Sequence, residues 1–282
     1  MKTALITGTS SGIGRAAVLR FQQEGWNVIA TMRSPEKENE LNQLDNVLVT
    51  KLDVLDNESI LNAVEQGLNI FGKIDVLVNN AGYAVFGTFE MTSDKQAHDM
   101  FDTNLFGPMR VLKAVLPHFR KQKSGTVINI TSMGGRVTFP ACSLYHATKF
   151  ALEGFTESLA YELLPFNIHT KIVEPGSTAT RFVGSAQVTE DTIAEYTAFV
   201  KIGLANWAKH DTMTSTAEEI ATVIYTAATD ENDRLRYKAG DDTALYFAKR
   251  QSENDQEYVD YMRQRFIPEL LNEASTQSRP SI

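Results

Sequence analysis

Short, continuously apolar runs alternate with segments of helical periodicity over the first 175 residues of the chain. Runs that are apolar throughout, rather than at every second residue, are typical of strands that helices cover on both faces. This alternation predicts an α/β fold with a parallel, doubly wound sheet and right-handed crossovers. The expected strands lie at about 3–7, 27–31, 47–52, 74–79, 126–131 and 168–173, and the expected helices include 15–24, 58–71 and 95–120.

The chain of 282 residues is interpreted as one domain, 1–282, because it has no internal repeat, low-complexity tract or Gly/Ser linker. Hydrophobic residues make up 43% and charged residues 22%, a globular balance with enough apolar material for a core. The segment 177–216 interrupts the alternation and carries apolar side chains in a helical pattern. We expect a helical lid over a substrate site there, with a packing or oligomer surface as the alternative. A C-terminal extension, 241–282, completes the chain.

Charge and cysteine content exclude several classes of protein. A net charge of −8 argues against binding to nucleic acid or to an anionic membrane surface. The single cysteine, Cys142, excludes internal disulfides and fits a reducing cytoplasm. We find no signal peptide and no window close to the ~20 apolar residues of a membrane span, so we expect a cytoplasmic location. The five histidines show no metal-ligand spacing, and no catalytic metal is expected.

A glycine-rich turn, Gly8-Thr9-Ser10-Ser11-Gly12-Ile13-Gly14, follows the first expected strand directly. Glycines allow a sharp turn and close approach of a ligand, and the start of the next helix offers free N–H groups and a positive dipole end. Such a turn alone is often only a tight strand–helix connection. Its place after the first strand favours a dinucleotide pyrophosphate. The expected contacts are Gly8, Ser10, Ser11, Gly12, Ile13 and Gly14.

The end of the second expected strand bears on the choice of cofactor. In NAD-binding units an acidic residue about 20 positions after the glycine turn bonds the ribose hydroxyl. Here the strand ends Ala30-Thr31-Met32-Arg33-Ser34, without an acid, and Arg33 can pair with a phosphate on that hydroxyl. We therefore expect NADP(H) in preference to NAD, with NAD still possible. The alternative is an arginine solvated at a strand end.

Tyr145 and Lys149 lie four residues apart, so in a helix they share one face. A phenol loses its proton near pH 10, and a positive charge beside it favours the phenolate and lowers the pKa. The pair therefore suits proton transfer to or from an alcohol or carbonyl oxygen. Alone such a pair is usually a surface feature. Ser132 and Asn104 upstream make the catalytic interpretation stronger.

Taken together, these motifs resemble the short-chain dehydrogenase/reductase family in its single-domain branch, which implies a Rossmann-like fold. The resemblance covers residues 1–182 and is closest to NADP-preferring reductases related to hydroxysteroid dehydrogenases. Thr148 stands in place of the family's common serine, and Ser177-Thr178 in place of a bulky or branched pair. The residues that match cofactor-binding motifs are Asp53 and Val54 for the adenine, Asn80, Ala81 and Gly82 beside the cofactor, and Pro175, Gly176, Thr178 and Thr180 for the nicotinamide carboxamide.

The resemblance also implies a catalytic tetrad and a reaction. Tyr145 would act as general acid or base, Ser132 would polarise the substrate oxygen, and Lys149 would lower the Tyr145 pKa and bond the nicotinamide ribose. Asn104 would hold a water in a proton relay. The implied activity is NADP(H)-dependent interconversion of a ketone or aldehyde with an alcohol on a mostly hydrophobic substrate. Ser132, Tyr145 and Phe182 are the expected substrate contacts.

Two other functions are weighed against this one. A non-catalytic NADP(H) sensor or scaffold would be expected to carry a damaged tetrad beside an intact glycine turn, and both are intact here. An epimerase or dehydratase of the family's longer branch would carry T-G-x-x-G-x-x-G and a larger C-terminal part. The resemblance suggests a homodimer or homotetramer, which the C-terminal extension could obstruct. The identity of the substrate stays open.

Overall fold

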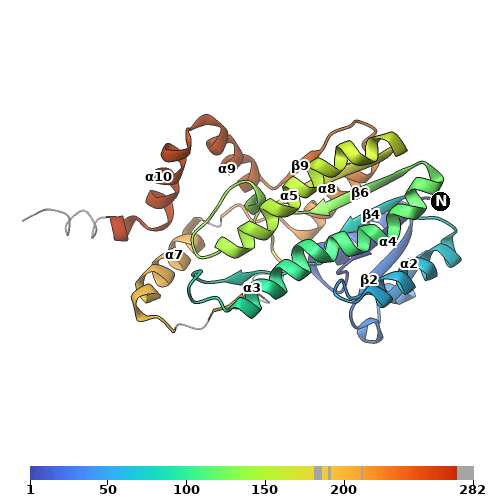
Figure 1. Cartoon of the computed structure of the whole chain (residues 1–282), viewed down its shortest axis with the longest axis horizontal. Coiled ribbons are helices and arrows are strands. Elements are labelled where there is room, and N and C mark those ends of the chain that lie inside the picture. Colours follow the sequence, from blue (N-terminus) through green and yellow to red (C-terminus); the bar gives the residue numbers. More distant parts are fainter. Residues whose placement is uncertain (181–185, 190–191, 211, 272–282) are drawn as a thin grey trace, which may run out of the picture.

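A parallel sheet in the order β3-β2-β1-β4-β6-β7-β9 forms the centre of the protein in a computed structural model (Figure 1). The structure describes residues 1–180, 186–189, 192–210 and 212–271. The six expected strands are confirmed within two residues at each end, and β9 adds a seventh at the edge. The strands are β1 (Thr3–Thr7), β2 (Asn27–Met32), β3 (Val47–Lys51), β4 (Val76–Asn79), β6 (Gly125–Ile130), β7 (Ile168–Pro175) and β9 (Arg236–Ala239).

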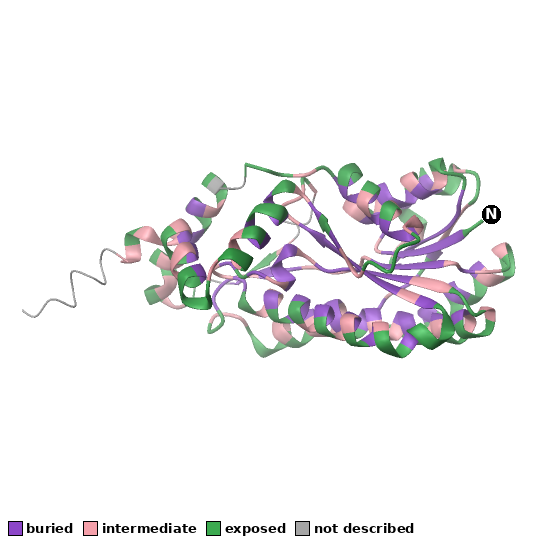
Figure 2. Cartoon of the chain, turned by 90° about the horizontal axis from the view of Figure 1, so that it is seen from above, coloured by how far each residue is buried: buried purple, intermediate pink, exposed green. Residues whose placement is uncertain are grey.

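Helices cover both faces of the sheet, which Figure 2 shows as buried strands between two helical layers. Neighbouring residues of β1 belong to different cores: Ala4 and Ile6 pack in one hydrophobic cluster and Leu5 in the other. Strands buried on both sides explain the continuously apolar runs of the sequence. One layer contains α1 (Gly12–Gln23) and α8 (Ala217–Thr229), and the other contains α2 (Asn57–Phe71), α4 (Gly107–Gln122) and α5 (Ser143–Leu163).

The expected helix 95–120 is three connected pieces. It begins as α3 (Asp94–Phe101), with a capping box between Ser93 and Gln96, and ends as α4. A π-helical turn, Asp102–Phe106, joins the two. Such turns widen a helix by one residue and frequently mark functional sites. Shorter turns of 3-10 helix lie at Pro35–Lys37, Leu41–Gln43, Met133–Gly135, Leu164–Phe166 and Ala194–Tyr196.

Beyond β7 the chain builds a helical layer at one end of the sheet (Figure 1). Phe139, near Tyr145 in sequence, has its ring centroid 4.7 Å from that of Trp207 and 5.7 Å from that of Phe266. Trp207 belongs to the insertion 177–216 and Phe266 to the C-terminal extension. The described parts of these two segments therefore pack against each other around Phe139. The elements of this layer are α7 (Thr197–His210), α9 (Asp241–Ser252), α10 (Asp255–Phe266) and a small parallel pair, β5 (Val85–Phe86) with β8 (Gln187–Val188).

Among the described residues, no helix has the length and apolar character needed to cross a membrane.

Candidate active site

The carboxyl ends of β1, β4, β6 and β7 meet at one edge of the parallel sheet, where ligands of open α/β sheets bind. Gly8 follows β1, Asn80 follows β4, Ser132 lies just beyond β6, and Gly176 follows β7. Residues that are far apart in sequence are thus brought to one edge of the sheet by topology alone.

Residues just after β4 hold the glycine turn in place through hydrogen bonds. The Asn80 side chain donates to the carbonyl oxygens of Thr7 and Gly8, at 2.9 and 3.1 Å. The backbone N–H groups of Asn80 and Ala81 both donate to the Thr7 hydroxyl, at 3.0 and 3.1 Å. A Cβ on Gly14 would lie 2.3 Å from the Gly8 carbonyl oxygen, so only glycine permits the helix to begin so close to the turn.

Helix α1 begins at Gly12 rather than near Arg15, because the turn itself supplies its first residues. The first helix-closing bond runs from the Arg15 N–H to the Ser11 carbonyl oxygen, at 3.3 Å. The N–H groups of Gly12, Ile13 and Gly14 therefore lie in the first turn, where a helix has no carbonyl of its own to offer them. Ser11 is exposed and forms no side-chain cap. This arrangement fits an anionic pyrophosphate.

The residues expected at the adenine and ribose end of a cofactor follow β2 and β3. Arg33 is exposed, and within the described ranges it makes no ion pair. Arg15, by contrast, forms an ion pair with Glu38 at 2.6 Å, and this arginine lowers the pKa of Glu38 to about 2. Asp53 is half-buried and accepts from the Leu55 N–H, whereas the Val54 side chain packs against Gly107.

Ser132 and Tyr145 are brought together by the turn after β6 and the first turn of α5. A side-chain hydrogen bond joins them. Ser132 Oγ also accepts from the Gly134 N–H at 3.0 Å and lies 3.5 Å from the Pro175 carbonyl oxygen. Lys149 lies one helical turn beyond Tyr145, and its Nζ donates to the Ile130 carbonyl oxygen at 3.1 Å and sits 5.8 Å from the Tyr145 ring centroid.

Asn104 faces this group from the π-helical turn and is almost fully buried. Its amide nitrogen donates to the Tyr83 carbonyl oxygen at 2.8 Å and to the Thr148 hydroxyl at 3.2 Å, and its oxygen accepts from the Tyr83 N–H. Thr148, which replaces the family's common serine, therefore keeps the hydroxyl that Asn104 bonds. A Cβ on Gly82 would lie 3.0 Å from the Asn104 oxygen and 3.9 Å from Lys149 Nζ, so glycine leaves space between them.

The two titratable groups differ from the sequence-based expectation. Burial raises the pKa of Tyr145 to about 12, against a smaller lowering by the Ser132 hydrogen bond. Burial also lowers the pKa of Lys149 to about 8, against a smaller raising by Glu153. In the chain by itself, desolvation thus dominates, and the pKa of the Tyr145 phenol lies above its ordinary value rather than below it. At neutral pH Tyr145 holds its proton, which is the state a general acid requires.

Residues 175–180, from the last residue of β7 onward, pass beside Ser132 and the glycine turn. The Thr178 hydroxyl donates to the Gly176 carbonyl oxygen at 3.0 Å. A Cβ on Gly12 would lie 3.3 Å from Thr180, so this segment reaches back to the glycine turn. Phe182, the expected substrate contact, lies outside the described residues.

Comparison with known proteins places the whole arrangement in a family. Residues 2–191 match the short chain dehydrogenase family, and these make up more than half of the chain. The chain belongs to the short-chain dehydrogenase/reductase family. It is an NAD(P)-dependent oxidoreductase of that family.

Several members of the family are similar over most of the chain. An uncharacterized oxidoreductase of Schizosaccharomyces pombe is 42% identical over 231 residues, 81% of this chain and 96% of that protein. A 3-ketodihydrosphingosine reductase of Bacteroides thetaiotaomicron is 38% identical over 186 residues, 66% of this chain and 67% of that protein. Human retinol dehydrogenase 8 is 40% identical over 192 residues, 65% of this chain and 61% of that protein.

Solved structures of the family share the fold. A short-chain dehydrogenase from Streptomyces avermitilis superposes with a TM-score of 0.81 at 34% identity, covering 93% of this chain and 98% of that one. ElxO with NADP bound superposes with a TM-score of 0.70 at 29% identity, covering 84% of this chain and 97% of that one. Solved relatives of this fold therefore bind NADP.

One further feature beside Tyr145 was missed in the sequence. The His146 ring forms hydrogen bonds to Gly134 and Phe139, in the segment that follows Ser132. The Phe139 N–H donates to His146 Nε2 at 2.8 Å, so Nδ1 carries the ring proton and donates to the Gly134 carbonyl oxygen at 2.8 Å. Burial lowers the pKa of His146, which favours this neutral form. Only its position next to Tyr145 signals this role in the sequence.

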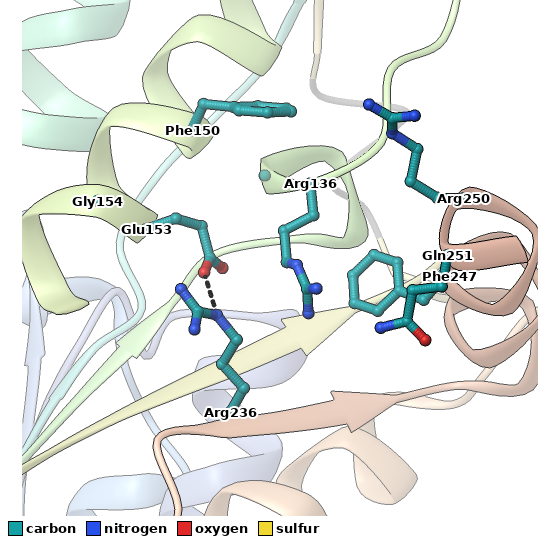
Figure 3. Close-up of a pocket in the computed structure, with 9 residues that line it drawn as sticks. Arg136, Phe150, Glu153, Gly154, Arg236, Phe247, Arg250 and Gln251 are labelled. Carbon is teal, nitrogen blue, oxygen red and sulfur yellow. Dashed lines mark hydrogen bonds and ion pairs between the residues drawn. The ribbon is translucent and has the colours of Figure 1, made fainter. Parts of the chain in front are cut away.

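A hollow of about 390 Å³ lies beside α5, and none of Asn104, Ser132, Tyr145 and Lys149 lines it (Figure 3). On its floor Arg236 Nε donates to Glu153 at 2.9 Å, and the Thr131 hydroxyl donates to the other oxygen of Glu153 at 2.6 Å. Arg136 lies 3.4 Å from the fully buried Glu174. These two arginines and two buried glutamates form an ionic cluster beside α5, and no motif in the sequence pointed to it. Among the described residues, no group of three or more metal-ligating side chains is found.

Proposed function

We propose that the chain is an NADP(H)-dependent oxidoreductase that interconverts a ketone or aldehyde with an alcohol on a mostly hydrophobic substrate. The observation that carries this proposal is the convergence of Ser132, Tyr145, Lys149 and Asn104 at the carboxyl edge of the sheet, beside the glycine turn. When bound, the nicotinamide cofactor would supply or accept the hydride. The chain's residues would bind it, orient the substrate and move the proton.

The proton step is assigned to Tyr145. Its raised pKa keeps the phenol protonated at neutral pH, so it can donate to the oxygen that becomes an alkoxide when a carbonyl is reduced. Ser132 would donate a hydrogen bond to the same oxygen, since the two side chains are already bonded. Lys149, with a pKa of about 8, is mostly cationic at pH 7 and would stabilise the developing negative charge. Asn104 would hold the water of a proton relay.

The preference for NADP(H) rests on Arg33. Its exposed side chain follows β2, where a ribose phosphate would lie in this fold, and no acid occupies the neighbouring positions. ElxO, a solved relative, is an NADP-bound member of the same fold. NAD would lack the phosphate that pairs with Arg33, and so it is the weaker ligand in this proposal.

The hydrophobic substrate is inferred from the side chains next to Tyr145. Tyr145 packs against a cluster that includes Met133, Phe139, Trp207 and Phe266. Two relatives carry names that denote lipid-like substrates, 3-ketodihydrosphingosine and retinol. A carbonyl or alcohol on a large apolar body fits these surroundings. We also propose that the protein is cytoplasmic and that it forms a homodimer or homotetramer. Light scattering of the purified protein would test the oligomeric state.

Turnover and binding measured together test the proposal. We expect NADPH to bind at least tenfold more tightly than NADH, a difference of about 1.4 kcal/mol, and to be oxidised when an apolar ketone or aldehyde is added. Tyr145→Phe should lower turnover by at least ~10²-fold and leave NADPH affinity within about twofold. NADPH binding without turnover across apolar carbonyls would favour the sensor or scaffold instead. Substantial activity of Tyr145→Phe would contradict the acid–base assignment.

A further inference from the structure

The segment 175–180 is held from outside the family-matched region by Asp242, in the first turn of α9. Oδ2 of Asp242 accepts from the Ser177 N–H at 2.6 Å, and Oδ1 accepts from the Thr243 N–H at 2.7 Å. The side chain is almost fully buried, with 7% of its surface exposed. Two backbone N–H groups thus bond to this one side chain, which joins the backbone after β7 to the first turn of α9.

The carboxylate fits a slot with glycine on both sides. A Cβ on Gly176 would lie 1.9 Å from Asp242 Oδ1, and a Cβ on Gly240 would lie 2.6 Å from the same atom. Gly240 also has a φ of +117°, which disfavours any side chain there. Two glycines therefore let the carboxylate come within hydrogen-bond distance of the backbone after β7.

The same segment is attached at other points that place it across the site. The Ser215 N–H donates to the Ser177 carbonyl oxygen at 2.9 Å, and the Ala179 N–H donates to the Ser215 carbonyl oxygen at 2.8 Å. Its start lies against Ser132, and its end, at Thr180, lies against Gly12 of the phosphate turn. A shift of the backbone at Ser177 would therefore move the segment that lies between Ser132 and the glycine turn.

Stabilisation of the α9 dipole does not by itself account for the contact between Asp242 and Ser177. Acidic residues in a first turn stabilise a helix through its dipole, and Asp241 shares that position. Asp241 is exposed, however, and only Asp242 extends to Ser177. The pair thus separates the effect of charge at the helix start from the effect of the contact with the segment 175–180.

We propose that Asp242 is a positioning residue for cofactor binding: it fixes the backbone after β7 in the conformation that receives the nicotinamide half of NADP(H). This inference rests on the proposed function. It assigns to the C-terminal helix α9 a part in the cofactor site, in addition to its packing on the aromatic cluster. It also predicts that the contribution is confined to the nicotinamide half and does not extend to the adenine half.

The test compares Asp242→Asn with Asp241→Asn, using two ligands. Asparagine has the shape of aspartate, but its NH₂ group would face one of the two N–H donors and lose that bond. We expect Asp242→Asn to weaken NADPH at least tenfold, about 1.4 kcal/mol, and to leave adenosine 2′,5′-bisphosphate, which lacks the nicotinamide half, within about twofold. Asp241→Asn should leave both ligands unchanged within about twofold.

Equal losses for the two ligands, or no loss for NADPH, would overturn the proposal. Amide hydrogen exchange on the wild-type chain gives a second readout that does not depend on the variant folding. The Ser177 amide should exchange slowly, and NADPH but not adenosine 2′,5′-bisphosphate should slow it further. Exchange of that amide at the rate of an open loop would also overturn the proposal. If the wild-type chain bound neither ligand, the proposed function would fall, and the exchange rate of the ligand-free chain would still decide whether Asp242 holds Ser177.

Discussion

Replacing Glu174 with glutamine should stabilise the folded chain at neutral and alkaline pH. Glu174 is fully buried on β7, Arg136 lies 3.4 Å from one of its oxygens, and the other oxygen has no hydrogen-bond partner within the described part of the chain. Burial, and then the nearby Glu153, raise its pKa from 4.5 to about 7. At about 1.36 kcal/mol per pKa unit, that difference corresponds to roughly 3 kcal/mol between folded and unfolded chains.

The direction of the effect follows from proton binding. Between pH 4.5 and about 7 the folded chain binds more protons at Glu174 than the unfolded chain does. The contribution of this group to stability is therefore complete below pH 4.5 and is lost as the pH rises through about 7. Glutamine does not titrate. The variant's free energy of unfolding, relative to wild type, should increase by up to ~3 kcal/mol from pH 4.5 to pH 8.

Urea denaturation of both proteins across this pH range measures the difference. Glu157→Gln is the control. Glu157 pairs with Arg236, which also lies 4.0 Å from Glu174, but the Glu157 side chain is half-exposed, so its loss should change stability by less than about 1 kcal/mol. The reasoning would be refuted by a Glu174→Gln effect that stays constant with pH. It would equally be refuted by a variant that grows less stable than wild type as the pH rises.

Three further perturbations test the site. Gly14→Ala should weaken NADPH at least ~10-fold in a fluorescence titration, because its Cβ would lie 2.3 Å from the Gly8 carbonyl oxygen. Gly154→Ala is the control: nothing lies within 4 Å of its Cβ, so urea unfolding should show a gain of about 0.5–1 kcal/mol. Arg33→Asp should weaken NADPH by ~2 kcal/mol and spare NADH, whereas equal losses would remove the phosphate assignment. His146→Leu should cost about 2 kcal/mol in the same unfolding assay, since it leaves a buried N–H and a buried carbonyl unpaired, and an unchanged midpoint would contradict these two hydrogen bonds.

The sheet was predictable wherever strands are buried on both faces. β1 and β4 contain unbroken apolar runs, 4–6 and 76–78, and the helices between strands carry clear periodicity. β9 was not predicted, because its four residues, Arg-Tyr-Lys-Ala, are short and alternate as an edge strand does. The π-helical turn at Asn104 was also not predicted, since one extra residue per turn leaves the helical pattern on either side unchanged.

The chemistry of the site was predictable only as a set of residues. Tyr145, Lys149 and Ser132 are brought together by the fold as their spacing indicated. The pKa of Tyr145 was expected to be lowered and is raised instead, because desolvation depends on how closely other segments pack around the hydroxyl. The spacing of residues along a helix does not predict how closely other segments pack around the Tyr145 hydroxyl.

Sequence by itself determined the strand–helix alternation, the glycine turn and the four candidate catalytic residues. These are local properties: backbone freedom, side-chain periodicity and the chemistry of single groups. Only the tertiary structure decided that Asp242 holds Ser177, that His146 bonds to Gly134, and that Glu174 is buried beside Arg136. In each case the two partners belong to different elements of the fold, and folding places them in contact. Hydrogen bonds and desolvation act over a few ångströms of space, whatever the separation along the chain.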